Sequence, residues 1–307
     1  MNRTIVITGA SGFLGRHVAR HFARQGHTVV GIGHGAWTRE EWEAWGLSEW
    51  YCADVTLETL EQYAGVPSVI IHCAGSGSVV FSIEHPLDDF KSTVETTAHV
   101  LEYVRRFAPA CRVVYPSSAS VYGTVETIPI REDCHAAPIS QYGVHKLMAE
   151  QMVSSYARQF RISAAIVRLF SVYGCGLRKQ LLWDACRKFA GHDNDFMGTG
   201  DEVRDWLHVE DAAELLMAAS EHVSIECPIV NGGSGKGTTV REVLVHLSNC
   251  LLQEGKPPIF SGASRRGDPS RYVADIEASK AWDWQPRLPW AQGVADYAAW
   301  WKGTCSE

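Results

Sequence analysis

A tyrosine and a lysine four residues apart, downstream of a serine-rich segment, are the residues of this chain best suited to move a proton. If the segment around them is helical, Tyr142 and Lys146 share one face. An ammonium beside a phenol favours the phenolate, so we expect Lys146 to lower the pKa of Tyr142. Ser118 would hydrogen-bond the same substrate oxygen. These residue types predict proton exchange with a hydroxyl or ketone oxygen.

A glycine-rich turn near the N-terminus is the second element with a chemical meaning. Residues 4–7 predict a strand, residues 16–25 predict a helix, and three glycines lie between them. Unpaired N–H groups and the helix dipole would converge there on an anion such as a pyrophosphate. Gly9 permits the tight turn, Gly12 a close approach of the anion, and Gly15 close packing of helix and strand. The pattern predicts a dinucleotide site.

Both groups of residues need a sheet edge to position them. Strands separated by helices predict an α/β fold with a doubly wound parallel sheet of the Rossmann type, whose ligands lie beyond the carboxyl ends of the strands. Further strands are predicted at 28–32, 50–52, 69–72, 112–115 and 164–169, and long helices at 86–107 and 141–159.

The chain is long enough for two domains. We expect residues 1–172 to form the dinucleotide-binding domain, with a return contribution from about 205–231. Residues 173–307 would form mainly a smaller α/β substrate domain.

The composition is that of an ordinary globular protein. The 307 residues are 46% hydrophobic and 21% charged, with a formal net charge of −7. This acidic balance argues against nucleic-acid binding, and no apolar run reaches the roughly 18 residues that span a bilayer. We therefore expect a cytoplasmic protein with neither nucleic acid nor membrane as partner. The nine cysteines form no C-x-x-C pair, so we expect buried thiols and no metal site.

With these motifs the sequence resembles the extended short-chain dehydrogenase/reductase family, in its NAD-dependent epimerase/dehydratase branch, which modifies nucleotide-activated sugars. The resemblance covers nearly the whole chain. Residues 8–15 resemble the family's cofactor loop, 53–55 its adenine-contacting turn and 71–75 the segment beside the nicotinamide ribose. The segments that resemble its substrate-side signatures are 168–174, 204–211, 231–235 and 265–268.

The resemblance implies a role for each matching residue. Ser118, Tyr142 and Lys146 align with the catalytic triad. The implied cofactor-binding residues, besides Tyr142 and Lys146, are Gly9, Ser11, Gly12, Phe13, Leu14, Gly15, His34, Asp54, Val55, Ala74 and Gly75. The implied substrate-binding residues are Ser82, Ser120, Ser171, Arg204 and Arg265. The two arginines would clamp a nucleotide diphosphate, with Arg266 as an alternative to Arg265.

The sequence departs from the family pattern at places that bear on the reaction and on the cofactor. Ala119 and Ser120 stand where dehydratases carry an acid, which disfavours sugar 4,6-dehydration. The second strand ends with His34 between two glycines, so the carboxylate that would hold the ribose 2′-hydroxyl is missing. This absence favours NADP, with NAD possible. His34 or Arg39 would then meet the 2′-phosphate.

Three functions compete for a protein that transfers hydride at a pyranose carbon, C4, of a nucleotide-diphosphate sugar, as in polysaccharide biosynthesis. A reductase of an NDP-4-keto-6-deoxy sugar consumes NADPH, and the missing acid slightly favours it. An NAD-dependent 4-epimerase keeps its cofactor, oxidises C4 and reduces the other face. A non-catalytic dinucleotide sensor should have lost the tyrosine or the lysine, and this chain has both.

A homodimer is also implied by the resemblance, through the helices near 86–107 and 141–159. Apolar residues at helical spacing on the second helix fit such an interface, although the same stripe could face the sheet. These residues are Val144, Leu147, Met148, Met152 and Tyr156.

Overall fold

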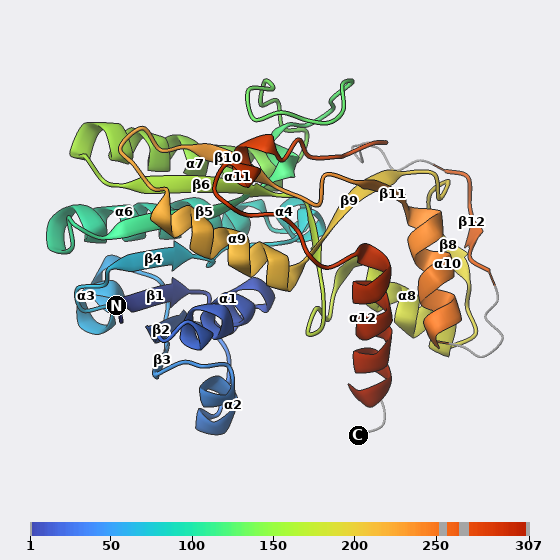
Figure 1. Cartoon of the computed structure of the whole chain (residues 1–307), viewed down its shortest axis with the longest axis horizontal. Helices are drawn as coiled ribbons and strands as arrows, with labels where there is room; N and C mark the ends of the chain where they lie inside the picture. Colours follow the sequence, from blue (N-terminus) through green and yellow to red (C-terminus); the bar gives the residue numbers. More distant parts are fainter. Residues whose placement is uncertain (1, 252–256, 264–269, 305–307) are drawn as a thin grey trace.

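The computed structural model describes residues 2–251, 257–263 and 270–304, with a seven-stranded sheet at its centre (Figure 1). The strand order is β10-β6-β5-β4-β1-β2-β3, and all neighbours are parallel. This confirms the predicted doubly wound α/β fold. The strands are β1 (Thr4–Thr8), β2 (Thr28–Gly33), β3 (Glu49–Cys52), β4 (Val69–His72), β5 (Arg112–Ser118), β6 (Ala164–Leu169) and β10 (Ile229–Gly232).

Helices cover both faces of this sheet because side chains alternate along each strand. In β1, Ile5 and Ile7 belong to the core beneath α1 and α9, whereas Val6 belongs to the core beneath α3, α6 and α7. Figure 1 shows these helices as two layers around the strands. They are α1 (Phe13–Arg24), α3 (Leu57–Tyr63), α6 (Thr96–Phe107), α7 (Gln141–Phe160) and α9 (Val209–Glu221). The short helix α2 (Arg39–Ala44), which buries no residue, lies beyond β3 at the bottom of Figure 1.

The helical region that follows β4 is interrupted rather than continuous. α4 (Val79–Glu84) and α5 (Pro86–Phe90) come first, and a π-helical turn, Lys91–Glu95, then leads into α6. The predicted helix at 86–107 therefore exists, but it contains one turn of wider winding.

Strand β5 continues past its predicted end at Tyr115 as far as Ser118. Pro116 suggests a strand end because it has no N–H to donate. However, β4 pairs with β5 only up to Val114, whereas β6 pairs with it to the end. Beyond Val114 the strand has a neighbour on one side only, so the proline is tolerated.

A second group of elements packs beside the carboxyl ends of the sheet, at the right of Figure 1. Its core includes Tyr173, Trp206 and Leu244. The chain then returns to the sheet, since α9 packs on α1 and β10 pairs with β6. A domain boundary at residue 172 stays a prediction. The remaining elements are β7 (Ser171–Tyr173), α8 (Gln180–Ala190), β8 (Asp195–Phe196), β9 (Val203–His208), β11 (Gly237–Thr239), α10 (Val240–Leu251), β12 (Ile259–Phe260), α11 (Glu277–Lys280) and α12 (Trp290–Thr304).

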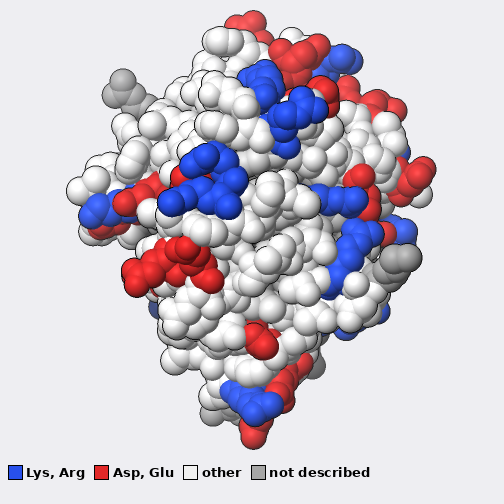
Figure 2. Space-filling model, turned by 90° about the vertical axis from the view of Figure 1, so that its left-hand side faces the viewer, with Lys and Arg blue, Asp and Glu red and all other residues white. Residues whose placement is uncertain are grey.

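The surface drawn in Figure 2 carries acidic and basic side chains interspersed among uncharged ones. Neither sign forms a continuous field over that face. Within the part of the chain that the structure describes, no helix is long and apolar enough to cross a membrane.

A buried ion pair joins three elements of the sheet and its cover. Arg168 on β6 donates to Glu150 on α7 (Nη2–Oε2, 2.8 Å), and their side chains are 6% and 3% exposed. Ser117 on β5 donates to the same carboxylate at 2.5 Å. Arg168 also donates to the Glu132 carbonyl oxygen at 3.1 Å. The pair therefore fixes α7 against the end of β5.

Replacing Glu150 by alanine should lower the free energy of unfolding by about 3–5 kcal/mol, because Arg168 would stay buried without its counter-ion. Urea denaturation followed by tryptophan fluorescence measures the loss. Glu277→Ala breaks an exposed pair with Lys280 and serves as the control, in which the midpoint should not move. Equal midpoints for the two variants would contradict the expectation.

Candidate active site

The glycine turn leaves room for an anion at the start of α1. Gly9 has a φ of +67°, and a Cβ there would lie 2.7 Å from the Ala74 nitrogen. A Cβ at Gly15 would overlap the Gly9 carbonyl oxygen. Gly12 is the N-cap of α1, and no side chain caps the helix. The N–H groups of its first turn, Phe13 and Leu14 included, are thus left for a phosphate.

A histidine–carboxylate pair lies just after β2 and β3, where we expected the ribose of the cofactor. His34 Nε2 lies 2.9 Å from Asp54 Oδ1, and both side chains are more than 70% exposed. The Ser11 hydroxyl donates to the His34 carbonyl oxygen, and Val55 is buried directly after Asp54. A carboxylate therefore does lie next to the end of β2, although it belongs to Asp54, which follows β3.

The two expected partners of a 2′-phosphate are placed differently from the prediction. Arg39 pairs with Glu43 at 2.7 Å on the exposed face of α2. A Cβ at Gly33 would lie 3.2 Å from the Gly9 Cα, so little room remains at that glycine. Instead of an open space, the edge of the site contains Asp54 held by His34.

Ser118, Tyr142 and Lys146 come together where β5 ends and α7 begins. Ser140 caps α7, which puts Tyr142 in the first turn, and Ser118 hydrogen-bonds Tyr142. Lys146 lies one turn further and donates to the Pro116 carbonyl oxygen at 3.1 Å. The three predicted catalytic residues are therefore neighbours in space.

Burial dominates the electrostatics of these residues. Burial raises the pKa of Tyr142, the hydrogen bond from Ser118 lowers it, and the charge of Asp89 raises it further. Burial also lowers the pKa of Lys146 to about 8. The expected lowering of the Tyr142 pKa by Lys146 was wrong for this geometry, because the ammonium is directed at a backbone carbonyl and desolvation outweighs it.

The segment after β4 closes the other side of the site. The Ala74 N–H donates to the Thr8 hydroxyl at 3.2 Å, and Gly75 has a φ of +134°. Ser82 is fully buried and accepts the Tyr142 N–H at 3.0 Å, so it fastens α4 to the first turn of α7. The Ser120 hydroxyl is buried with no partner among the described residues.

The substrate-side residues lie on a small sheet of strands β11-β9-β7. Ser171 pairs with Trp206, and Arg204 is two residues from Trp206 along β9, so Ser171 and Arg204 share one face. Arg204 donates to the Val203 carbonyl oxygen at 3.0 Å. Arg265 and its alternative Arg266 lie outside the described residues.

Asp205 organises the loop that follows β10. Its carboxylate is fully buried and accepts the N–H groups of Ser234, Gly235 and Ala274, the last two at 3.0 Å. Sequence reasoning missed this role, although Asp205 lies in the quoted segment 204–211. Its partners are 29 to 69 residues away, and the sequence gives no sign of them.

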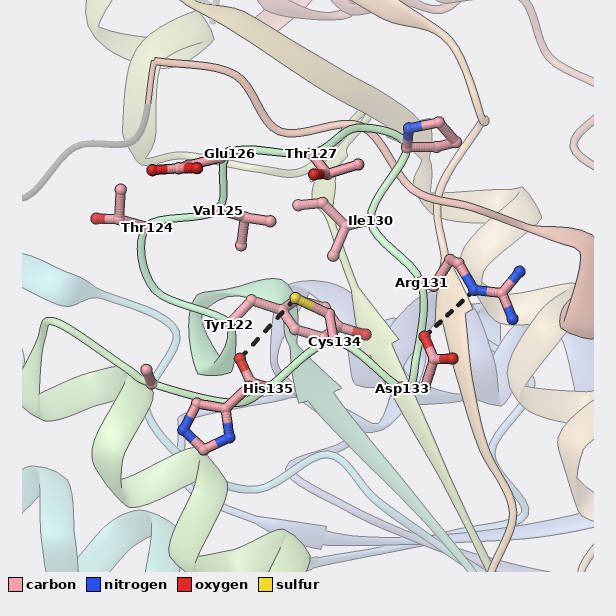
Figure 3. Close-up of a pocket in the computed structure, with 12 residues that line it drawn as sticks. Tyr122, Thr124, Val125, Glu126, Thr127, Ile130, Arg131, Asp133, Cys134 and His135 are labelled. Carbon is pink, nitrogen blue, oxygen red and sulfur yellow. Dashed lines mark hydrogen bonds and ion pairs between the residues drawn. The ribbon is translucent and has the colours of Figure 1, made fainter.

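A cavity of about 410 Å³ lies under the loop 124–137 (Figure 3). Tyr122 forms one wall, and its hydroxyl donates to Asn231 at 2.7 Å. Arg131 and Asp133 pair at the rim at 3.2 Å. Neither Ser118 nor Tyr142 lines it.

The sequence matches a known family over most of its length. Residues 5–231 match the model of the NAD dependent epimerase/dehydratase family. The chain belongs to this family. The matched region contains the glycine turn, Ser118, Tyr142 and Lys146, and the resemblance inferred from the motifs is confirmed.

Individual members of the family align with this chain over nearly its whole length. It is 30% identical to the UDP-glucose 4-epimerase of Azospirillum brasilense, over 97% of this chain and 91% of the relative. It is 28% identical to the CDP-paratose 2-epimerase of Salmonella typhi, over 96% and 98%. The structure of UDP-glucose 4-epimerase from Brucella ovis in complex with NAD shares 27% identity, with a TM-score of 0.84 over 97% of this chain and 98% of that one.

The desolvation of Lys146 has a measurable consequence for stability. With a pKa of about 8 when folded and 10.5 as the ordinary value, this lysine binds more protons in the unfolded chain between those pH values. Stability should therefore rise with pH over that window, by at most about 3 kcal/mol. Lys146→Met lacks this contribution, so wild type should gain stability relative to the variant from pH 8 to 10.5. A difference that stays constant in urea titrations would contradict the desolvated lysine.

Proposed function

We propose that this protein is an NAD-dependent epimerase of a nucleotide-linked sugar, acting at C4. The observation that carries the proposal is the group Ser118–Tyr142–Lys146 beside a dinucleotide cradle. The relatives named above support epimerisation over the 4-keto-sugar reduction that the sequence slightly favoured. The proposal therefore adopts the second of the three functions considered from the sequence.

The chain's own residues would supply the proton steps. In its phenolate form Tyr142 takes the C4 hydroxyl proton as that carbon is oxidised, and the resulting phenol returns the proton to the C4 oxygen when the opposite face is reduced. Ser118 donates a hydrogen bond to the same oxygen and holds it in reach of Tyr142. A bound nicotinamide dinucleotide would supply the hydride acceptor and then the donor.

The residues present fit a dinucleotide. The uncapped start of α1 and the close approach at Gly9 and Gly15 form a cradle that side chains would fill. We propose NAD rather than NADP, because a 2′-phosphate beside His34 would meet the carboxylate of Asp54. An epimerase also returns the hydride to its own substrate, so it has no need to exchange the cofactor. The NAD complex of the Brucella relative supports this choice.

The nucleotide diphosphate would bind on the second group of elements. Arg204 and Ser171 share a face of the small sheet, and Asp205 holds the adjoining loop through backbone N–H groups. A guanidinium matches a diphosphate by bidentate hydrogen bonding. Arg265 stays the predicted second clamp. Residues 1–172 and 173–307, with the return segment near 205–231, remain our proposed division into cofactor and substrate domains.

A homodimer through the helices at 86–107 and α7 also remains a proposal. Of the predicted stripe, Leu147, Met152 and Tyr156 pack within the subunit, whereas Met148 is 38% exposed. Exposed Phe107 and Phe160 extend the available apolar surface. A monomer mass in light scattering at micromolar concentration would count against the dimer.

Tyr142→Phe should lower the turnover of a UDP-sugar 4-epimerisation by about 100-fold or more, the scale of lost acid–base catalysis. Dinucleotide binding, followed by isothermal titration, should be unchanged because the ring remains. Tyr156→Phe removes a hydroxyl from the same helix and serves as the control with normal turnover. Near-normal turnover in Tyr142→Phe would remove Tyr142 from the mechanism.

Denatured protein should release NAD, and dinucleotide-free protein should bind NAD more tightly than NADP. Asp54→Asn should improve NADP binding about tenfold, because the carboxylate that repels the 2′-phosphate is gone. Glu49→Gln removes an exposed carboxylate from the start of β3 and should leave the preference unchanged. Tighter NADP binding by the wild type would return the reductase to first place.

A further inference from the structure

A buried carboxylate–imidazole pair joins α5 to α7 within one helical turn of Tyr142 and Lys146. Asp89 on α5 is fully buried, and His145 on α7 is 6% exposed. Asp89 Oδ2 lies 2.5 Å from His145 Nδ1. The imidazole also meets the ring of Phe90 edge-on, with centroids 5.6 Å apart. Neither the dinucleotide cradle nor the proton steps described above use this pair.

The second oxygen of Asp89 makes the pair unusual. Oδ1 is buried and has no hydrogen-bond partner among the described residues. Buried carboxylates normally have hydrogen bonds to both oxygens, because a desolvated charge is costly. A charge with one oxygen unpartnered acts on its neighbours with little screening.

Three groups of the catalytic region respond to that charge. For Tyr142, burial is the main cause of the raised pKa, and Asp89 raises it further. For Lys146, burial lowers the pKa to about 8, and Asp89 is among the charges that oppose this lowering. Burial chiefly raises the pKa of Tyr115, and Asp89 adds to the effect. The geometry agrees with this, since His145, which contacts Asp89, is three residues after Tyr142 and directly before Lys146 on α7.

We propose that Asp89 and His145 form a positioning pair, in which His145 donates its Nδ1–H and holds one carboxylate charge in place behind Tyr142 and Lys146. This inference rests on the proposed function in one respect only, namely that Tyr142 and Lys146 are the acid–base residues. It would set how readily these two groups exchange protons, without touching the substrate. A purely structural pair would instead fasten α5 to α7 and leave the protonation of Lys146 unchanged.

Two neighbours of Lys146 keep their charge over the pH range that its titration covers. Burial raises the pKa of Cys73 to about 12 and lowers that of His72 to about 3, so neither changes charge between pH 6 and pH 10. The other groups that face this region are Asp89 from α5, Tyr142, His145 and Glu150 from α7, and Tyr115 from β5. Of these, Glu150 is held by Arg168.

The test is a pH titration of Lys146 by NMR of lysine-labelled protein, with Lys146→Met identifying the signal. Asp89→Asn should lower the pKa of Lys146 by about one further unit, because a nearby opposite charge is lost. Asp88→Asn removes an exposed carboxylate from the same helix and is the matched control, with no shift expected. His145→Asn keeps the carboxylate and offers it an amide donor, so the pKa should stay close to that of wild type.

The titration needs neither substrate nor turnover, so it can fail or succeed independently of the epimerase proposal. If UDP-sugar epimerisation is found, the pH–rate profile of Asp89→Asn should also shift to lower pH, and that of Asp88→Asn should not. A folded Asp89→Asn with the Lys146 pKa of wild type overturns the positioning role. Should that variant not fold, Asp89→Ser, whose hydroxyl still bonds His145, takes its place. If neither folds, the pair is structural and the proposal is wrong.

Discussion

The ion pair between Arg168 and Glu150 is the interaction on which the position of Ser118 relative to Tyr142 and Lys146 depends. It joins β6 to α7, and Ser117 on β5 donates a hydrogen bond to its carboxylate. Its guanidinium also donates to the Glu132 carbonyl oxygen, in the loop that covers the cavity. Two desolvated charges stabilise a fold only when their remaining hydrogen-bonding groups are also satisfied. Here they are, and the serine-bearing strand end and the tyrosine-bearing helix are thereby held in one arrangement.

Local signals in the sequence were sufficient to predict the cradle and the catalytic helix. Each of these signals lies within a few residues: the glycines, the apolar run before them, and the spacing of Tyr142 and Lys146. The fold follows from the alternation of predicted strands and helices along the chain. The continuation of β5 through Pro116 could not be predicted, because it depends on which strands lie beside it. Asp54 and His34 were both expected at the cofactor site, but their pairing could not be predicted, because they are 20 residues apart and follow different strands.

The direction of the Tyr142 pKa shift also could not be predicted from the sequence. From spacing alone, an ammonium next to a phenol predicts a lowered tyrosine pKa. In the folded chain both groups are desolvated, and desolvation acts in opposite directions on an acid and a base. Burial cannot be read from a four-residue interval, so the sign of the effect on Tyr142 emerged only from the structure. Function likewise depended on relatives, since reductases and epimerases need the same three side chains.

The π-helical turn at Lys91–Glu95 sets the rotational phase between α5 and α6. Each residue advances an α-helix by about 100°, so a turn with one residue too many rotates everything before it relative to everything after it. Asp89 lies before the turn and the sheet-facing residues of α6 lie after it. A lineage that deleted one residue here would restore a regular helix and aim Asp89 away from His145. The contact between Asp89 and His145 therefore depends on the number of residues in this turn as well as on the two side chains.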